Sequence, residues 1–306
     1  MNATTPPLVY TLIVNWNGKE DTLACLESLQ KISYKNYKIT VIDNASTDGS
    51  VQAIAAKYPT VEIIRNQKNE RFARANNQGI DLALENGASY ILLLNNDTVV
   101  DPAFLDFMVA RAQKDPCTGM VGPKIYYADQ PNVLWYAGGE ILLPKGRIAH
   151  TGIRELDAGQ FDRAGETGYA TGCCILANRE CIEKIGFLDE SYFIYTEDAD
   201  WCWRARINGF KIRFEPRAKI WHKISSSSGG PSIAGGQTAF KTYYKIRGMM
   251  KFFGRYAKWY HWFTIMFFWK WQFLKALYIM IVAKNWAGIR AMFRAGTGRS
   301  AEKESE

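Results

Sequence analysis

The stretch VYTLIVNWNG, residues 9–18, decides the fold class of this chain. Its first six residues form a short apolar run of the kind found in β-strands, and polar turn residues follow at once. Leu23, Leu26 and Leu29 then repeat with the spacing of one helix face. Apolar strands that alternate with helices are typical of a parallel sheet with both faces covered.

The same order recurs along the first hundred residues, so we predict an α/β fold with a Rossmann-like, doubly wound sheet. Gly and Pro interrupt short β-like pieces between 116 and 168, and the topology there stays open. The expected strands are 9–14, 37–42, 61–64, 90–94 and 171–177, and the expected helices are 48–57, 72–84, 179–185 and 197–207.

Polar segments follow three of the predicted strands. They are NWNG at 15–18, DNASTDGS at 43–50 and NNDT at 95–98. Each one alone is explained as a turn, because Asn, Asp and Gly favour turns. Ligands of doubly wound sheets bind beyond the carboxyl ends of the strands, however, and three such segments at one sheet edge indicate a binding site.

Six segments carry a resemblance to a known family when they are taken in this order. They are VNWNG (14–18), VIDNASTDGS (41–50), FARANNQG (72–79), LLLNNDT (92–98), FLDESYFIYTEDADWCWRAR (187–206) and WHKISSS (221–227). Together they resemble family 2 glycosyltransferases with the GT-A fold, in particular the bacterial branch that contains many rhamnosyltransferases. The resemblance covers about three quarters of the chain.

The resemblance implies a nucleotide-sugar donor and a divalent ion. Asp43 is expected to receive the nucleobase, and Asp97 is expected to be the metal ligand, because the triplet Asn95-Asn96-Asp97 stands at the position of the family's DxD-type motif. Oxygen ligands suit Mg²⁺ or Mn²⁺, which neutralises the departing diphosphate. The residues expected to bind the donor are Asn15, Asn17, Asp43, Asn77, Asn95, Asn96 and Arg204.

The resemblance also implies an inverting transfer with Asp198 as the general base, supported by Glu197 and Asp200. Two adjacent acids raise the pKa of one of them, which suits a base. Acids at a helix start also act simply as caps, and that alternative stays open. His222 is expected to be an additional metal ligand, with a buried structural histidine as the alternative.

Two further expectations concern the donor. The run 225–228 is expected to close over the diphosphate. Arg71 stands where the family commonly has Gly, and it faces either the donor phosphates or solvent. The rhamnosyltransferase branch makes dTDP-rhamnose the leading donor and a UDP-hexose the alternative.

The charge of the chain is concentrated in its C-terminal part. Residues 1–215 carry 22 Lys and Arg against 27 Asp and Glu, a net charge of −5, whereas 216–301 carry 15 Lys and Arg and no acid. Many aromatic residues accompany these cations. We expect a GT-A catalytic domain at 1–228 and, at 229–306, a helical extension that lies on an anionic membrane surface. A spanning helix and an ordinary packing helix are the alternatives.

Other sequence features narrow the class of protein. Six cysteines without a CxxC pair argue against a zinc module or a disulfide scaffold. The N-terminus lacks a basic region before its apolar run, so we expect a cytoplasmic enzyme, peripheral at the inner membrane face. The expected acceptor is a lipid-linked saccharide, and a homodimer is left open. Nucleic-acid binding explains the basic tail but not Asp43, Asp97 and Asp198, and a non-catalytic sugar-binding domain is a further alternative.

Overall fold

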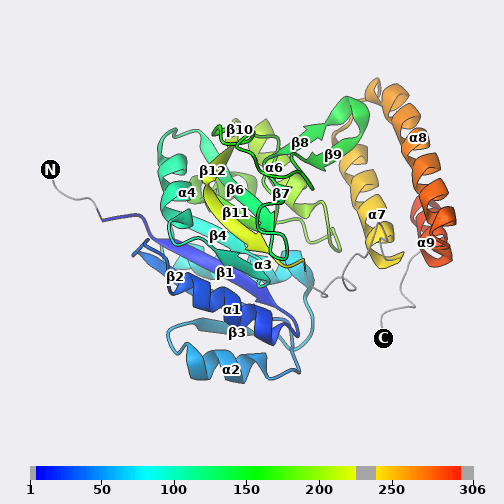
Figure 1. Ribbon diagram of the computed structural model, residues 1–306. Helices are drawn as coiled ribbons and strands as arrows, with labels where there is room; N and C mark the ends of the chain where they lie inside the picture. Colours follow the sequence, from blue (N-terminus) through cyan, green and yellow to red (C-terminus); the bar gives the residue numbers. More distant parts are fainter. Residues whose placement is uncertain (1–4, 225–238, 298–306) are drawn as a thin grey trace. The chain divides into compact units, whose positions relative to one another are not determined.

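The computed structural model describes residues 5–224 and 239–297. The chain divides into two compact units (Figure 1). The first comprises 1–140, 149–190 and 197–224, and the second comprises 141–148, 191–196 and 225–306. Two short segments of the predicted catalytic domain therefore belong to the second unit. The predicted boundary at 228, like the predicted closing loop at 225–228, lies outside the described residues.

One ten-stranded mixed sheet forms the centre of the first unit, in the order β10-β12-β6-β11-β4-β1-β2-β3, with β5 beside β12 and β7 beside β6. The strands are β1 (Val9–Asn15), β2 (Tyr37–Asp43), β3 (Glu62–Arg65), β4 (Tyr90–Leu94), β5 (Thr98–Val100), β6 (Thr118–Tyr127), β7 (Leu134–Tyr136), β10 (Gly165–Glu166), β11 (Cys174–Asn178) and β12 (Lys211–His222). A separate hairpin contains β8 (Gly139–Leu142) and β9 (Arg147–His150). The helices are α1 (Lys19–Leu29), α2 (Ser50–Lys57), α3 (Arg71–Glu85), α4 (Phe104–Gln113), α5 (Arg179–Ile185) and α6 (Glu197–Ile207).

Strands β1 to β4 form the parallel half of the sheet, as the apolar runs predict. β1 lies between β2 and β4 and pairs in parallel with both. Its side chains alternate between two covered faces. Val9 and Ile13 share a buried cluster with Leu26 of α1. Leu12 points to the opposite face, where α3 approaches so closely that a Cβ on Gly79 would lie 2.9 Å from Leu12 Cδ1.

The other half of the sheet was not predicted in full. β11 runs antiparallel to β4, and β12 runs parallel to β6. The twelve residues of β12, KIRFEPRAKIWH, contain four Lys and Arg residues and a proline, which obscure the strand in a search for apolar runs. This strand ends at His222, which is the register partner of Thr98 in β5. β12 thus places His222 beside the NNDT segment.

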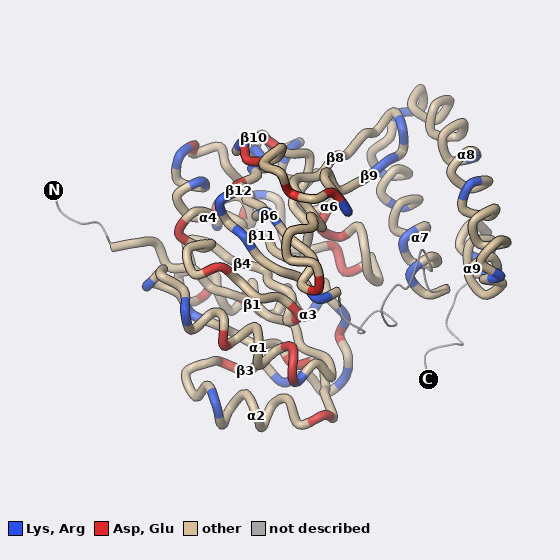
Figure 2. The backbone as a smooth tube through the Cα atoms, viewed as in Figure 1, with Lys and Arg blue, Asp and Glu red and all other residues tan. Residues whose placement is uncertain are grey.

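The second unit consists of α7 (Ala239–Tyr256), α8 (His261–Val282) and α9 (Trp286–Thr297), together with the short η1 (Leu143–Lys145) and the segment 191–196. The Trp269 indole donates to the Gly146 carbonyl at 2.9 Å, which fixes α8 to the turn after η1. α8 is apolar around its circumference, and Ile265 is its one fully buried residue. By length and composition alone, α8 is a candidate membrane span. Figure 2 shows Lys and Arg along all three helices.

Candidate active site

Asn15, at the end of β1, is the centre of a hydrogen-bond network. Its amide nitrogen donates to Asp43 Oδ1 at 2.8 Å and to Ser46 Oγ at 3.0 Å. Its amide oxygen accepts from Thr22 Oγ1 at 2.8 Å and from Asn96 Nδ2 at 3.3 Å. Asn15 is fully buried, and its hydrogen bonds connect the ends of β1, β2 and β4 into one corner. The structure therefore brings together three of the predicted donor-binding residues, Asn15, Asp43 and Asn96.

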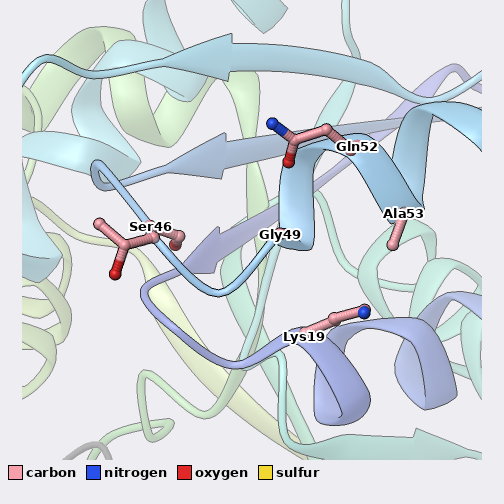
Figure 3. A pocket seen from close by; sticks show the side chains of 6 residues that line it. Lys19, Ser46, Gly49, Gln52 and Ala53 are labelled. Carbon is pink, nitrogen blue, oxygen red and sulfur yellow. The ribbon is translucent and has the colours of Figure 1, made fainter.

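An open cavity of about 600 Å³ adjoins this corner. Figure 3 shows how the loop that carries Ser46 lies between the start of α1, at Lys19, and the first turn of α2. Ser46 connects the cavity to Asp43, because its backbone N–H donates to Asp43 Oδ2 at 2.9 Å. Asn17 borders the same loop, and its side-chain oxygen accepts from the Thr47 N–H at 2.8 Å. The lining residues are Lys19, Ser46, Thr47, Gly49, Gln52 and Ala53.

Asp97 and His222 form a buried pair at the neighbouring strand end. Asp97 Oδ1 lies 3.1 Å from His222 Nε2, and each side chain is only 7% exposed. His222 Nδ1 is buried without a hydrogen-bond partner among the described residues. The side chain of Asn95, the first residue of the triplet, makes no hydrogen bond within the described chain, whereas Asn96 belongs to the Asn15 network.

The Asp97–His222 pair fits a divalent ion that takes further ligands from its substrate. Two ligands at a right angle, each about 2.1 Å from an octahedral ion, are about 3.0 Å apart, close to the observed separation. Among residues 5–224 and 239–297 no group of three or more His, Cys, Asp and Glu gathers around one point. Mg²⁺ is commonly held by one or two protein ligands, with waters and phosphates completing its shell.

A short loop, 171–173, brings Asp198 toward this pair. The Cys173 carbonyl accepts from the Asn95 N–H at 2.9 Å, and the Gly172 N–H donates to Asp198 Oδ2 at 2.8 Å. Burial raises the pKa of the Cys173 thiol well above its usual range, and the charges of Asp97 and Asp198 raise it further. Cys173 therefore lies within electrostatic reach of both acids, which stand 101 residues apart in the chain.

The carboxyl groups of the first two residues of α6 both have raised pKa values. Burial raises the pKa of Asp198 above its ordinary value, although the hydrogen bond from Gly172 acts in the opposite direction. Burial and the adjacent Asp198 charge raise the pKa of Glu197 as well. Glu197 Oε2 has no partner among the described residues. The pair therefore favours one negative charge over two, and Asp198, which receives the backbone N–H, is the better stabilised anion.

Two predicted donor ligands have other roles. Arg204 pairs with the buried Asp200 at 2.8 Å and donates to the backbone carbonyls of Ile185 and Phe187. Its guanidinium thus fixes α6 to the end of α5. These contacts engage three of the five guanidinium N–H groups, and the expected contact of Arg204 with the donor stays a prediction. Asp200 is the buried partner of Arg204, and its expected support of the base Asp198 likewise stays a prediction.

Asn77 is also a structural residue in this fold. Its amide nitrogen donates to the Leu188 carbonyl and to Glu190 Oε1, both at 3.0 Å, while its oxygen accepts from the Leu188 N–H. It therefore fastens α3 to the segment before α6. Both N–H donors of the amide are engaged in these contacts, and the expected contact of Asn77 with the donor stays a prediction.

Sequence reasoning missed three residues that complete the corner. Thr22 and Ser46 hold Asn15, and Gly172 holds Asp198. Small polar residues and glycines are common in turns, so the sequence alone does not distinguish Thr22, Ser46 and Gly172 from other turn residues. Arg71 is exposed with a φ of 68°, a left-handed conformation that explains why Gly is favoured at this position.

The fold is that of a GT-A glycosyltransferase, and the Asn15 network and the Asp97–His222 pair lie at neighbouring strand ends. The model of the family described as "Glycosyl transferase family 2" matches residues 10–186. The chain belongs to this family.

Two relatives are named for rhamnose transfer. One is an N-acetylglucosaminyl-diphospho-decaprenol L-rhamnosyltransferase of Mycobacterium tuberculosis, 26% identical over 67% of this chain and 72% of its own length. The other is a dTDP-rhamnosyl transferase of Shigella flexneri, 26% identical over 72% of this chain and 70% of its own. An uncharacterised Sinorhizobium fredii protein is 28% identical over 73% of this chain, which spans only 25% of that protein.

Solved structures support the fold. A mannosyltransferase from Pyrobaculum calidifontis, in complex with GDP-Man and Mn²⁺, aligns with 97% of this chain and 77% of its own, with a TM-score of 0.61 and 16% identity. A GalNAc-T7 structure with UDP, GalNAc and Mn²⁺ aligns with 84% of this chain and 50% of its own, with a TM-score of 0.61 and 17% identity. At these identities the likeness carries the fold alone.

Proposed function

We propose that this glycosyltransferase is a metal-dependent, inverting enzyme that transfers L-rhamnose from dTDP-rhamnose to a lipid-linked saccharide at the inner face of the membrane. One observation carries the proposal. Three carboxylates from distant parts of the chain, Asp43, Asp97 and Asp198, lie around one sheet edge and are connected by the Asn15 network and the 171–173 loop.

The donor half of the reaction belongs to the corner around Asn15. Asp43 presents its carboxylate to the nucleobase, and Asn15 and Ser46 hold that carboxylate in place. Asp97 and His222 hold Mg²⁺ or Mn²⁺ together with the donor diphosphate. When bound, the ion supplies positive charge that stabilises the departing nucleoside diphosphate.

Asp198 performs the acceptor half. Its carboxylate accepts the proton of the acceptor hydroxyl while that oxygen attacks the anomeric carbon, and a raised pKa makes the carboxylate a stronger base. The Gly172 N–H holds Oδ2, which fixes the orientation of the base. Inversion follows from a single displacement, for which one base is enough.

The sugar and the acceptor are inferred from the named relatives and from the second unit. Both named relatives transfer rhamnose, and the Mycobacterium tuberculosis relative has a lipid diphosphate in its name. A UDP-hexose is the alternative donor. The apolar α8 and the absence of acids from the described residues of the second unit support a membrane-bound acceptor.

The test is calorimetric binding of dTDP-rhamnose, UDP-glucose, UDP-galactose and GDP-mannose, each with Mn²⁺ or Mg²⁺. We expect dTDP-rhamnose to bind only with metal, and Asp97→Ala to abolish binding. Asp81→Ala, which removes an exposed acid on α3, is the matched control. Asp198→Asn should keep donor binding and lower the transfer rate about 10²- to 10⁴-fold. Metal-independent binding, or binding of another donor alone, would overturn the corresponding part of the proposal.

A further inference from the structure

The second unit contains a basic cavity that the proposed chemistry does not use. The cavity measures about 340 Å³ and lies between α7 and the segment 191–196, which belong to the same unit. Arg247 and Lys251 of α7 line it from one side. They stand four residues apart, so they lie on the same face of the helix. The complete lining is Ser191, Tyr192, Arg247, Gly248, Met250 and Lys251.

The walls of this cavity are held firmly together. A Cβ on Gly248 would lie 2.6 Å from Thr196 Oγ1 and 2.9 Å from the Tyr195 carbonyl oxygen, so α7 contacts the segment at its backbone. One turn earlier, the Tyr244 ring stacks on Phe193 with centroids 4.0 Å apart. Close backbone contact and ring stacking therefore hold the two walls of the cavity together.

Its polar groups favour an anion. Lys251 donates to Ser191 Oγ and lies 4.6 Å over the Tyr192 ring, which positions the ammonium at the cavity wall. Arg247 is exposed and adds a planar fork of donors that matches phosphate oxygens. The segments 141–148, 191–196 and 239–297 contain no Asp or Glu, so no carboxylate of these segments competes for the cations.

The same unit offers an apolar surface for a lipid chain. α8 lies beside α7, with the Phe253 and Trp269 rings 5.9 Å apart. Its Phe263 and Phe267 are 74% and 72% exposed. A phosphate-binding cavity and an exposed apolar helix in one unit are the two elements that recognise a prenyl diphosphate.

We propose that the Arg247–Lys251 cavity binds the diphosphate of the membrane-anchored acceptor. This inference rests on the proposed function for the class of acceptor. The cavity volume lies within the range of about 300–1,000 Å³ typical of small-molecule sites. Arg247 binds phosphate oxygens through two parallel hydrogen bonds, and Lys251 and the Ser191 hydroxyl bind the remaining oxygens.

The experiment is titration of the full-length protein with farnesyl diphosphate, farnesol, inorganic pyrophosphate and phosphatidylglycerol vesicles. Arg247→Gln/Lys251→Gln should weaken farnesyl diphosphate binding by at least about tenfold, because it removes two charge-assisted contacts. Lys270→Gln/Lys275→Gln on α8 is the control, since it removes the same charge outside the cavity. Farnesol binding should be equal in all variants, and circular dichroism verifies their folding.

Three outcomes overturn the inference. An equal loss in both double variants indicates diffuse attraction to the basic unit. If Arg247→Gln/Lys251→Gln weakens only vesicle binding, the cavity binds phospholipid headgroups. If it weakens only pyrophosphate binding, the cavity binds a free anion. Donor binding by the same protein, measured in parallel, tests the proposed function separately, so the two can fail independently.

Discussion

Glu197 stands beside the proposed base, yet the two acids have different surroundings. Asp198 receives the Gly172 N–H, whereas Glu197 Oε2 is buried without a partner among the described residues. Burial and the Asp198 charge raise the pKa of Glu197. Glu197 therefore stays protonated where an exposed glutamate is ionised, which keeps a second negative charge away from the leaving diphosphate.

The raised pKa of Glu197 predicts how stability depends on pH. The folded chain holds this proton more tightly than the unfolded chain, so the free energy of unfolding falls as pH rises from about 4.5 toward the raised pKa. Glu197→Gln removes this loss because a neutral amide has no proton to release. In urea unfolding, the variant should gain stability over wild type at pH 8 and little at pH 4.

The control for this measurement is Glu180→Gln, which removes an exposed glutamate from the first turn of α5. It should change stability by no more than about 0.5 kcal/mol at either pH. If Glu197→Gln were destabilising at pH 8, the buried carboxyl would be an ionised and satisfied group instead.

A buried lysine on β6 connects the sheet to the long loop before β10. Lys124 is completely buried, and its ammonium contacts Asp157 Oδ2 at 2.9 Å and Asp162 Oδ1 at 2.5 Å. The Tyr126 hydroxyl also donates to Asp157 at 2.6 Å. Because both acids lie in the loop, this one cation fixes the loop to the strand.

Removing both acids should be strongly destabilising. Asp157→Asn/Asp162→Asn leaves the Lys124 ammonium buried without a counter-charge, at a cost of about 3–5 kcal/mol of unfolding free energy. Adding Lys124→Met should recover most of this loss, because no buried charge remains. Denaturant titrations of the three proteins measure the effect. Equal midpoints for wild type and the double variant would show that water already solvates Lys124.

At the scale of elements, the segment 191–196 depends on α7 for its shape. Tyr195 and Thr196 have φ angles of 69° and 77°, which non-glycine residues adopt at a cost. Gly248 allows α7 to approach this pair closely enough to hold it. Thr196 directly precedes Glu197 and Asp198 in the chain, so its conformation sets the start of α6.

A pair of glycine substitutions in α7 tests this dependence. Gly254 has open space around its Cα, so Gly254→Ala should stabilise the helix by up to about 1 kcal/mol. Gly248→Ala gains the same helix propensity but collides with Thr196, and it should lower both the melting temperature and kcat while donor binding stays unchanged. Equal melting temperatures for the two variants would contradict the close packing.

The sequence predicted the parallel half of the fold because β1, β2 and β4 are apolar on both faces and end in polar turns. It did not predict β6 and β12 as neighbours, because β12 is rich in cations and its partners are distant in the chain. The structure brings Asn15, Asp43 and Asn96 together at one sheet edge, whereas the roles expected of the motif residues stay predictions. Asn77 and Arg204 also hold neighbouring segments together, and these contacts cannot be read from a sequence motif.

At the scale of the whole molecule, the N-terminal and C-terminal parts of the chain differ in net charge and in exposed apolar surface. The three carboxylates of the candidate active site, Asp43, Asp97 and Asp198, belong to the part of the chain with a net charge of −5. The described residues of the second unit contain no acid (Figure 2). Large apolar side chains on α8 are exposed. We expect anionic lipid to attract the cations of the second unit, and the exposed apolar side chains to strengthen the binding.

We therefore predict that the full-length protein floats with vesicles that contain phosphatidylglycerol and floats less with phosphatidylcholine alone. Each Phe removed from the bilayer costs about 1.5–3 kcal/mol, so Phe263→Ser/Phe267→Ser should shift most of the protein to the unbound fraction. Trp16→Ser, at a 45% exposed position of the first unit, is the control and should float like wild type. If the protein lies on the membrane surface, high salt should weaken its binding to the vesicles, and alkaline carbonate should release it. Retention after carbonate would instead show that α8, with its 22 residues, spans the bilayer.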